Sequence, residues 1–455
     1  MIICQICLLL LGAIIYLRKP QFVFLFWLSF TPFAILLFSW GLNIYARDDL
    51  ASLQFYITGL TRNYFGLLII IALCKRKKIP NITNLVALFF TLSIFFALHS
   101  YMNVFNKNII SANISEISAL ILPLLFLMID KEAIPSQKNL LTYIFILLGI
   151  EALAAYLNTH GIYFYKASYI SAYSASLQNS YDYEKSLVSG TFPRYNMLGN
   201  YISTIFVFFT LEFLSKKKKN TKAFIFGSLI MLSIIALSGA KMSLFLAVLI
   251  LSISLIIYGK KNIGLSFLFF IGIALCFNFL LQYHYNMEQQ SDRFAGLFRQ
   301  IEGFASLAQK SHDGSTASIS TYLLSKYFFH NPFLGNGLAA NGEYAYGFFA
   351  YVGLTEFKAD ARIAFILVEY GIIGFLLYAL LLKNIYNILS KNLIKGAHIK
   401  LIICFIYFSI LTITEPGFFD RVCFPMVYIY VFAFLKKENN TPKINSINQN
   451  TDIIM

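Results

Sequence analysis

Charged residues are scarce in this 455-residue chain. Only 13% of the residues are Asp, Glu, Lys or Arg, whereas 58% are hydrophobic. Soluble globular proteins carry about 25% charged and about 45–50% apolar residues. A soluble fold of this length could not bury so much apolar surface. The composition therefore excludes the soluble class and indicates a polytopic membrane protein.

Cysteine, histidine and nucleotide-binding motifs are also few or missing. The six cysteines lie in or beside apolar segments and show no extracellular pairing pattern. The six histidines are scattered without the spacing of metal ligands, and neither HExxH, a Walker loop nor GxGxxG occurs. We therefore predict no metal, no ATP and no redox cofactor.

Acidic residues are outnumbered by basic ones, 21 to 36, which gives a formal net charge of +15. Such an excess can indicate nucleic-acid binding, but the basic residues sit in short clusters between apolar runs. Successive clusters are separated by two runs, so all of them fall on one side of the membrane, which the positive-inside rule assigns to the cytoplasm. The clusters are Arg18/Lys19, 75–78, 130–138, 216–222, Lys260/Lys261, 383–400 and Lys436/Lys437.

About thirteen apolar runs are long enough to approach the ~20 residues that span a bilayer. If the first and weakest run does not span, about twelve remain. We predict an all-α polytopic membrane domain over 1–435 and a polar cytoplasmic tail over 436–455. The runs are 2–17, 21–40, 55–74, 83–100, 114–129, 140–157, 196–214, 223–238, 242–259, 263–281, 361–382, 400–414 and 418–435.

Because each apolar run crosses the membrane once, the basic clusters also fix the side of every other connection. Two long loops, at about 158–195 and 282–360, fall on the side opposite the cytoplasm. A loop of the second length is uncommon in a folded protein unless it has a function or is disordered. The second loop contains "RFAGLFRQIEGFASLAQ", whose apolar residues have helical spacing, so we expect short helices there.

The first loop and the start of the following run carry candidate binding residues. The loop is rich in tyrosine, and Tyr169 and Tyr173 suit either the stacking of sugar rings or a membrane-interface belt. Arg194 follows Pro193 directly and precedes the apolar run. Its planar fork suits a phosphate, which it can bind with two parallel hydrogen bonds, although a lipid-headgroup contact is equally compatible.

Further cations lie on the predicted outer side. Lys241 occupies a very short turn between two runs, where it either snorkels or reaches a buried anionic group. Arg293 and Arg299 are six residues apart in the second loop, with acidic residues nearby that also fit a solvated helix with local ion pairs. Arg62 lies near the outer end of the third run and is a further candidate for an interior cation.

The stretch "FKADARIAFILVEYGIIGFLLYALLL", residues 357–382, places three charged residues at the front of a membrane run. An ionised side chain near the bilayer costs several kcal/mol unless it is paired or faces water. We therefore expect Asp360 to be paired or to face water. Glu369, nine residues on, is predicted to point to the opposite helix face and to support packing or pair with Arg362.

Four stretches occur in a recognisable order: "GTFPRYNMLGNY" 190–201, "LSGAKMS" 237–243, "NPFLGNGL" 331–338 and "DARIAFILVEYGIIGFLLY" 360–378. Together they resemble the O-antigen polymerase/ligase superfamily of bacterial inner-membrane proteins over about residues 185–380. Each stretch alone is weakly specific, and the resemblance lies in their order, spacing and position relative to the apolar runs.

The resemblance implies a membrane glycosyltransferase whose site faces the periplasm. A growing glycan would leave undecaprenyl pyrophosphate and join another lipid-linked repeat unit, with a chain-length regulator and a flippase as neighbours in the membrane and no role for nucleic acid. Arg194 and Arg293, with Lys241 and Arg299, would stabilise the departing pyrophosphate. Asp360 would act as a general base or orient an arginine.

Two residues differ from the family pattern, and one of them bears on the choice between a polymerase and a ligase. Lys241 stands where the family often has arginine, and Asp360 stands where the ligases carry their functional histidine. The second departure favours an O-antigen polymerase over a ligase that transfers glycan to lipid A–core. A flippase of lipid-linked oligosaccharide is the alternative from another class. Transporters tend to show internal repeats and polar residues at mid-membrane, whereas here no repeat is visible, the charges gather at the outer edge and the loops are unequal.

Overall fold

The structure is a computed structural model. It describes residues 2–26, 134–160, 188–192, 195–215, 221–258, 328–335, 362–412 and 423–436, together with the single residues 71, 88, 91, 162 and 324. Within these ranges the secondary structure is helical and no strand occurs, which confirms the predicted helical class for this part of the chain. The elements are α1 (Ile2–Arg18), η1 (Pro20–Phe22), α6 (Gln137–Thr159), α9 (Tyr195–Ser215), α10 (Thr221–Ser238), α11 (Lys241–Tyr258), η3 (Phe328–His330), α16 (Arg362–Leu389), α17 (Ala397–Leu411), α18 (Phe424–Tyr430) and the π-helical turn η5 (Val431–Leu435).

Three of the described helices are long and apolar enough to cross a membrane: Gln137–Thr159, Met197–Ser215 and Ile366–Leu389. Four more are apolar but shorter: Lys222–Ser238, Met242–Tyr258, Ala397–Leu411 and Met426–Leu435. These helices coincide with predicted apolar runs, so the chain has the helices of a membrane protein. The predicted runs at 114–129 and 263–281 lie outside the described residues, as do most of the runs 21–40, 55–74 and 83–100, most of both predicted loops, and the tail beyond residue 436.

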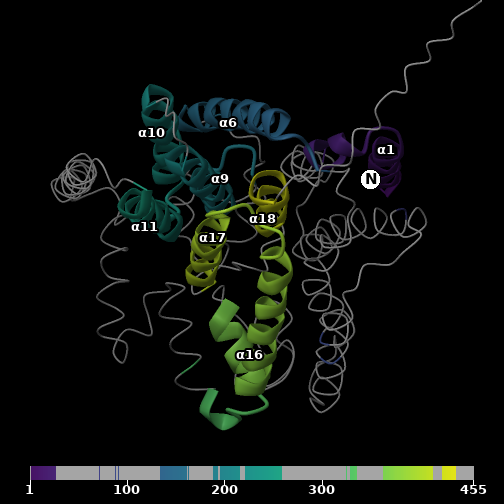
Figure 1. Cartoon of the computed structure of the whole chain (residues 1–455), viewed down its shortest axis with the longest axis vertical. Helices are drawn as coiled ribbons and strands as arrows, with labels where there is room; N and C mark the ends of the chain where they lie inside the picture. Colours follow the sequence, from purple (N-terminus) through teal and green to yellow (C-terminus); the bar gives the residue numbers. More distant parts are fainter. Residues whose placement is uncertain are drawn as a thin grey trace, which may run out of the picture.

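Helix α9 lies among α6, α10, α11 and α17 (Figure 1). It packs along α10 and α11, and Phe209 on α9 meets Phe145 of α6 edge to face at 6.2 Å between ring centroids. On another side, the Ser203 hydroxyl shares a hydrogen bond with the Tyr407 hydroxyl of α17. An apolar helix surrounded in this way buries nearly every side chain, and the residues from Leu198 to Phe208 are all buried.

The ends of the helices are joined by hydrogen bonds between segments far apart in the sequence. At the start of α16, the Ile363 N–H donates to the Thr412 carbonyl just after α17. Beyond the other end of α16, the Ile394 N–H donates to the Leu435 carbonyl in η5, beside a bridge between Leu393 and Lys436. These bonds satisfy backbone groups that helix ends leave without intrahelical partners.

Helix α16 is broken at Gly371, whose backbone angles are φ 63° and ψ −165°. This conformation is essentially restricted to glycine. The sequence predicts one continuous helix over 361–382, whereas the structure has two helical parts, of which the second continues to Leu389. Figure 1 draws a short and a long part that meet near η3. The break is compatible with an apolar environment because the turn after η3 supplies acceptors, as described below.

Candidate functional site

The turn that leads into α9 is held by two polar side chains of α6. The Glu151 carboxylate accepts hydrogen bonds from both the N–H of Thr191, at 3.0 Å, and the Thr191 hydroxyl. Glu151 is only 2% exposed. Burial of a polar group is costly unless it is hydrogen-bonded, so these two bonds attach the turn to α6.

Asn158, two turns further along α6, completes this attachment. Its side-chain oxygen accepts from the N–H groups of Ser189 at 3.1 Å and Gly190 at 2.8 Å, and its amide nitrogen donates to the Ile162 carbonyl. Gly190 has a φ of +61°, and a Cβ at this position would overlap a Glu151 carboxylate oxygen. Only glycine fits here, and this is the glycine that opens the first family-like stretch.

The turn between α10 and α11 packs on the first part of α9. Gly199 approaches so closely that a Cβ there would overlap the Cβ of Ala240, and it would lie 2.9 Å from the Ser238 hydroxyl oxygen. Next to this contact, the Ser243 hydroxyl of α11 donates to the side-chain oxygen of Asn200. The first and second family-like stretches therefore meet at one end of α9.

This contact brings together the chain positions next to two predicted phosphate-binding residues. Tyr195, the residue after Arg194, begins α9, and Lys241, the residue after Ala240, begins α11. Tyr195 precedes Gly199 by one helical turn, which is about 6 Å along the α9 axis. Because Gly199 contacts Ala240, the positions of Tyr195 and Ala240 along this axis are separated by only about that distance. Lys241 is thus at the same end of α9 as the residue that follows Arg194, although the Lys241 side chain lies outside the description.

The third and fourth stretches also meet, at the break in α16. The N–H groups of Ile372 and Ile373 donate to the carbonyls of Pro332 and Phe333, at 2.8 and 3.1 Å. A Cβ on Gly371 would overlap the Phe333 carbonyl, and a Cβ on Gly335 would overlap the backbone of Glu369. Glu369 itself is buried.

Most of the predicted site residues cannot be placed. Arg62, Tyr169, Tyr173, Arg194, Arg293, Arg299 and Asp360 lie outside the described residues, as does the side chain of Arg362. Asp360 is two residues before α16, so α16 is the described element nearest to it along the chain. Within the described ranges, no three His, Cys, Asp or Glu side chains form a group that could hold a metal ion.

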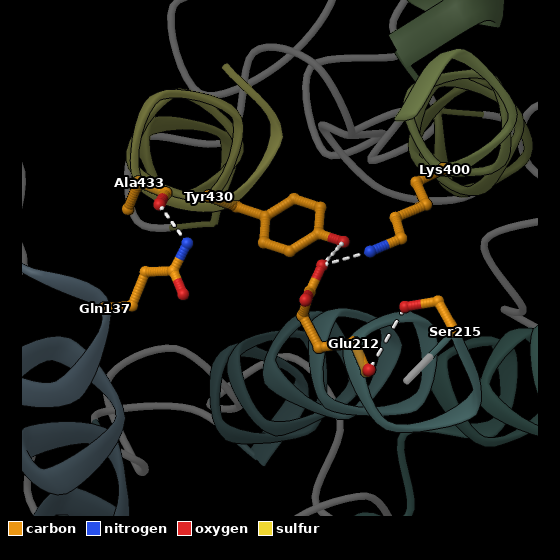
Figure 2. A network of polar contacts seen from close by, with 6 residues as sticks. All are labelled: Gln137, Glu212, Ser215, Lys400, Tyr430 and Ala433. Carbon is orange, nitrogen blue, oxygen red and sulfur yellow. Dashed lines mark hydrogen bonds and ion pairs between the residues drawn. The ribbon is translucent and has the colours of Figure 1, made fainter. Parts of the chain in front are cut away.

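A second polar cluster joins α9, α17 and α18 at the other end of α9. Lys400 and the Tyr430 hydroxyl both donate to the Oε1 atom of Glu212, at 2.7 and 2.8 Å. Figure 2 shows these two side chains converging on the carboxylate from different helices. The Lys400 and Glu212 side chains are 9% and 14% exposed, so this is a largely buried ion pair.

Sequence reasoning did not single out Glu151, Asn158 or Glu212. The signal was available, because Glu151 and Glu212 are the acidic residues within the apolar runs 140–157 and 196–214. An ionisable residue inside a membrane run is by default a functional-site candidate.

No family model, no curated protein and no solved structure matches this chain.

Proposed function

We propose that this chain is a polymerase of a lipid-linked surface polysaccharide, in the manner of an O-antigen polymerase of the bacterial inner membrane. It transfers a growing glycan from undecaprenyl pyrophosphate to the terminal sugar of another lipid-linked repeat unit on the periplasmic side. The bond to the pyrophosphate breaks, a glycosidic bond forms, and the acceptor hydroxyl loses its proton. The proposal extends to a multi-pass topology of about 12–13 spans with two long periplasmic loops.

The observation that carries this proposal is the packing of the family-like stretches in pairs. Gly199 meets Ala240, and Gly335 meets Gly371, each at a distance that only the absence of a side chain allows. Segments about forty residues apart in sequence thus make close contacts at glycines that lie inside the family-like stretches. Such contacts are expected if the stretches form one site, and they are not required if the four similarities arose by chance.

Under this proposal the anchored turn at 188–192 has a specific use. It fixes the chain immediately before Pro193 and Arg194, at a buried point on α6. An arginine that stabilises a departing pyrophosphate must be held in place before the reaction, because preorganised charge is what lowers the barrier. Glu151 and Asn158 are then positioning residues, and Lys241 contributes a second positive charge from the start of α11.

The lipopolysaccharide ladder of a deletion strain tests the proposal. Loss of a polymerase leaves lipid A–core capped with a single repeat unit. Uncapped core together with accumulated lipid-linked polymer would instead identify a ligase. An unchanged ladder would contradict a role in O-antigen assembly. It would indicate that the protein acts on another polysaccharide or is a transporter.

The proposed phosphate-binding residues give a second test in the complemented strain. Replacement of Arg194 or Arg293 by alanine should abolish polymer while the protein stays in the membrane. Lysine at either position should retain only part of the activity, because a point charge lacks the paired donors of the guanidinium. Normal polymer from both alanine variants would show that these arginines do not act on the pyrophosphate.

A further inference from the structure

An apolar groove of about 130 Å³ runs between α6, α9 and the α18–η5 segment. Its walls include Phe145 of α6, Phe213 of α9 and Phe434 of η5. Phe145 is 51% exposed although it lines the groove, so the groove is open along α6 rather than enclosed. On α6 it extends from Leu140 to Leu148, which is about 12 Å along the helix axis. This length is close to the ~15 Å half-thickness of a bilayer hydrocarbon core, so the groove matches one leaflet.

One end of the groove lies where all three segments that line it begin or end. Helix α6 begins at Gln137, whose side chain donates to the Ala433 carbonyl in η5 at 2.9 Å (Figure 2). Helix α9 ends at Ser215, and η5 ends at Leu435. A lipid whose hydrocarbon chain occupied the groove would therefore have its headgroup at this end, beside the helix termini.

Helix α6 places a lysine at this end of the groove. Lys138 is exposed and lies in the first turn of the helix. It shares a helix face with Leu141 and Phe145, three and seven residues further on, and both of these residues line the groove. Among the described residues, no carboxylate pairs with Lys138. Its ammonium is thus available to an anionic group at the mouth of the groove.

The other two segments also carry lysine at this end. Lys436 directly follows η5, and its Nζ atom lies 4.4 Å from the centroid of the Phe432 ring, which holds the ammonium beside that segment. In the sequence, α9 is followed directly by four lysines at 216–219. All three segments that line the groove therefore contribute positive charge at the same end.

The acidic residue among those that line the groove does not oppose this charge. Glu212 accepts at Oε1 from Lys400 and from the Tyr430 hydroxyl, at 2.7 and 2.8 Å. Lys400 supplies one positive charge for one carboxylate, so this pair adds no net charge. The lysines at the helix ends therefore set the sign of the charge at the mouth of the groove.

We propose that this groove binds one acyl chain of an anionic phospholipid, with Lys138 and Lys436 contacting the phosphodiester of its headgroup. The apolar walls suit a hydrocarbon chain, and basic pockets between membrane helices on the cytoplasmic side suit anionic headgroups. A zwitterionic headgroup gains less, because its own ammonium is repelled by the lysines. The groove ends at Leu148, so it fits a chain that crosses one leaflet rather than a much longer polyprenyl chain. This inference does not depend on the proposed function.

Lipid retention by the full-length protein tests the proposal. The protein purified in detergent would be titrated with phosphatidylglycerol or with phosphatidylethanolamine, and bound lipid would be counted by native mass spectrometry. Wild type should retain phosphatidylglycerol, and phosphatidylethanolamine should be retained about tenfold less, because its headgroup has no net charge. Equal retention of the two lipids would overturn the role of the lysines.

Two lysine variants test the mouth of the groove. Lys138→Gln should lower phosphatidylglycerol retention about fivefold, the effect expected for one lysine near the membrane surface. Lys383→Gln is the matched control, because Lys383 is exposed on α16, a helix that contributes no residue to the groove. The control should retain the lipid as wild type does. Equal retention by the two variants would overturn the role of Lys138.

Two tryptophan variants test the groove itself. Ile144→Trp fills the groove and should remove bound phosphatidylglycerol, whereas Ile146→Trp, which is exposed on α6 and not a groove residue, should keep it. Unchanged retention in Ile144→Trp would overturn the groove assignment. The lysine variants test the proposal even if Ile144→Trp fails to fold, because both lysines are exposed. Displacement of phosphatidylglycerol by an equal amount of undecaprenyl phosphate would overturn the phospholipid assignment.

Discussion

At the scale of single residues, the stability of the fold depends on glycines and on buried polar atoms. Gly190, Gly335 and Gly371 have positive φ, and each occupies a point where a Cβ would overlap another part of the chain. Glu151 and Asn158 hold a turn through side-chain acceptors in an apolar surrounding. Inside such a surrounding a lost hydrogen bond leaves its partner unsatisfied, so isosteric changes at these positions should be costly.

Gly371→Ala should destabilise the protein by more than about 3 kcal/mol, because it combines a glycine-only conformation with overlap against the Phe333 backbone. Gly396 is the matched control: its φ is +84°, but a Cβ there would meet nothing within 4 Å. Gly396→Ala should cost only about 1 kcal/mol, the penalty of the left-handed backbone. Thermal unfolding of both variants in detergent would measure the difference, and equal midpoints would contradict the overlap.

Thr191→Val removes the hydroxyl that donates to Glu151 and keeps the size of the side chain. We expect a loss of about 1–3 kcal/mol in stability, since the buried carboxylate retains a single donor. Thr159→Val is the control, because that hydroxyl bonds only exposed neighbours at the end of α6. If the proposed function holds, polymer formed per amount of protein should fall in Thr191→Val alone. Equal stability of the two variants would show that Thr191 does not anchor the turn.

At the scale of elements, buried polar contacts join helices that apolar packing alone would not orient. The Glu212–Lys400 pair joins α9 to α17, and Tyr430 joins α18 to the same carboxylate. The backbone bonds from Ile372 and Ile373 join the second part of α16 to the turn after η3. In a hydrocarbon surrounding, directional bonds of this kind fix which helix faces meet, because lipid is as apolar as the side chains it would replace.

The Glu212–Lys400 pair should show strong coupling in a double-mutant cycle. Glu212→Leu or Lys400→Leu alone leaves a buried charge without its counterion, so each should lower the free energy of unfolding by about 3–5 kcal/mol. The double variant should recover most of that loss. The measurement is the unfolding midpoint of each protein in the same detergent. Losses that simply add in the double variant would indicate that the two side chains act independently.

At the scale of the whole molecule, the contacts between helix ends agree with the proposed topology. Gln137–Ala433, Ile394–Leu435 and Glu212–Lys400 join ends that the basic clusters assign to the cytoplasm. Ile363–Thr412 and Val188–Leu237 join ends assigned to the periplasm. None of these contacts joins ends assigned to opposite sides, as the proposed alternation requires.

Reporter fusions test that topology directly. Fusions after Ser180 and after Ser311 should behave as exported, because both fall in loops opposite the basic clusters, and a fusion after Lys219 should behave as cytoplasmic. An alkaline phosphatase and a fluorescent-protein series at the same three sites would report each side independently. The reverse pattern at either loop would refute the topology and remove the proposed periplasmic site with it.

The sequence by itself determined the helical membrane class and the location of the described helices. Length and hydropathy suffice for this, because every backbone polar group in a bilayer must be satisfied within its own segment. Through the resemblance it also indicated the stretches that contain Gly199, Gly335 and Gly371, without showing what these glycines contact. For Arg194, Arg293 and Asp360 the sequence still gives only an expectation.

Only the tertiary structure decided which segments meet. The break at Gly371 depends on acceptors from Pro332 and Phe333, about forty residues earlier in the chain, so no local pattern near Gly371 could predict it. The partners of Glu151 and Glu212 could not be read from the sequence for the same reason. Thr191 is 40 residues from Glu151, and Lys400 and Tyr430 are 188 and 218 residues from Glu212. A periodic pattern reports the face of a helix, whereas a buried hydrogen bond depends on which face another helix presents to it.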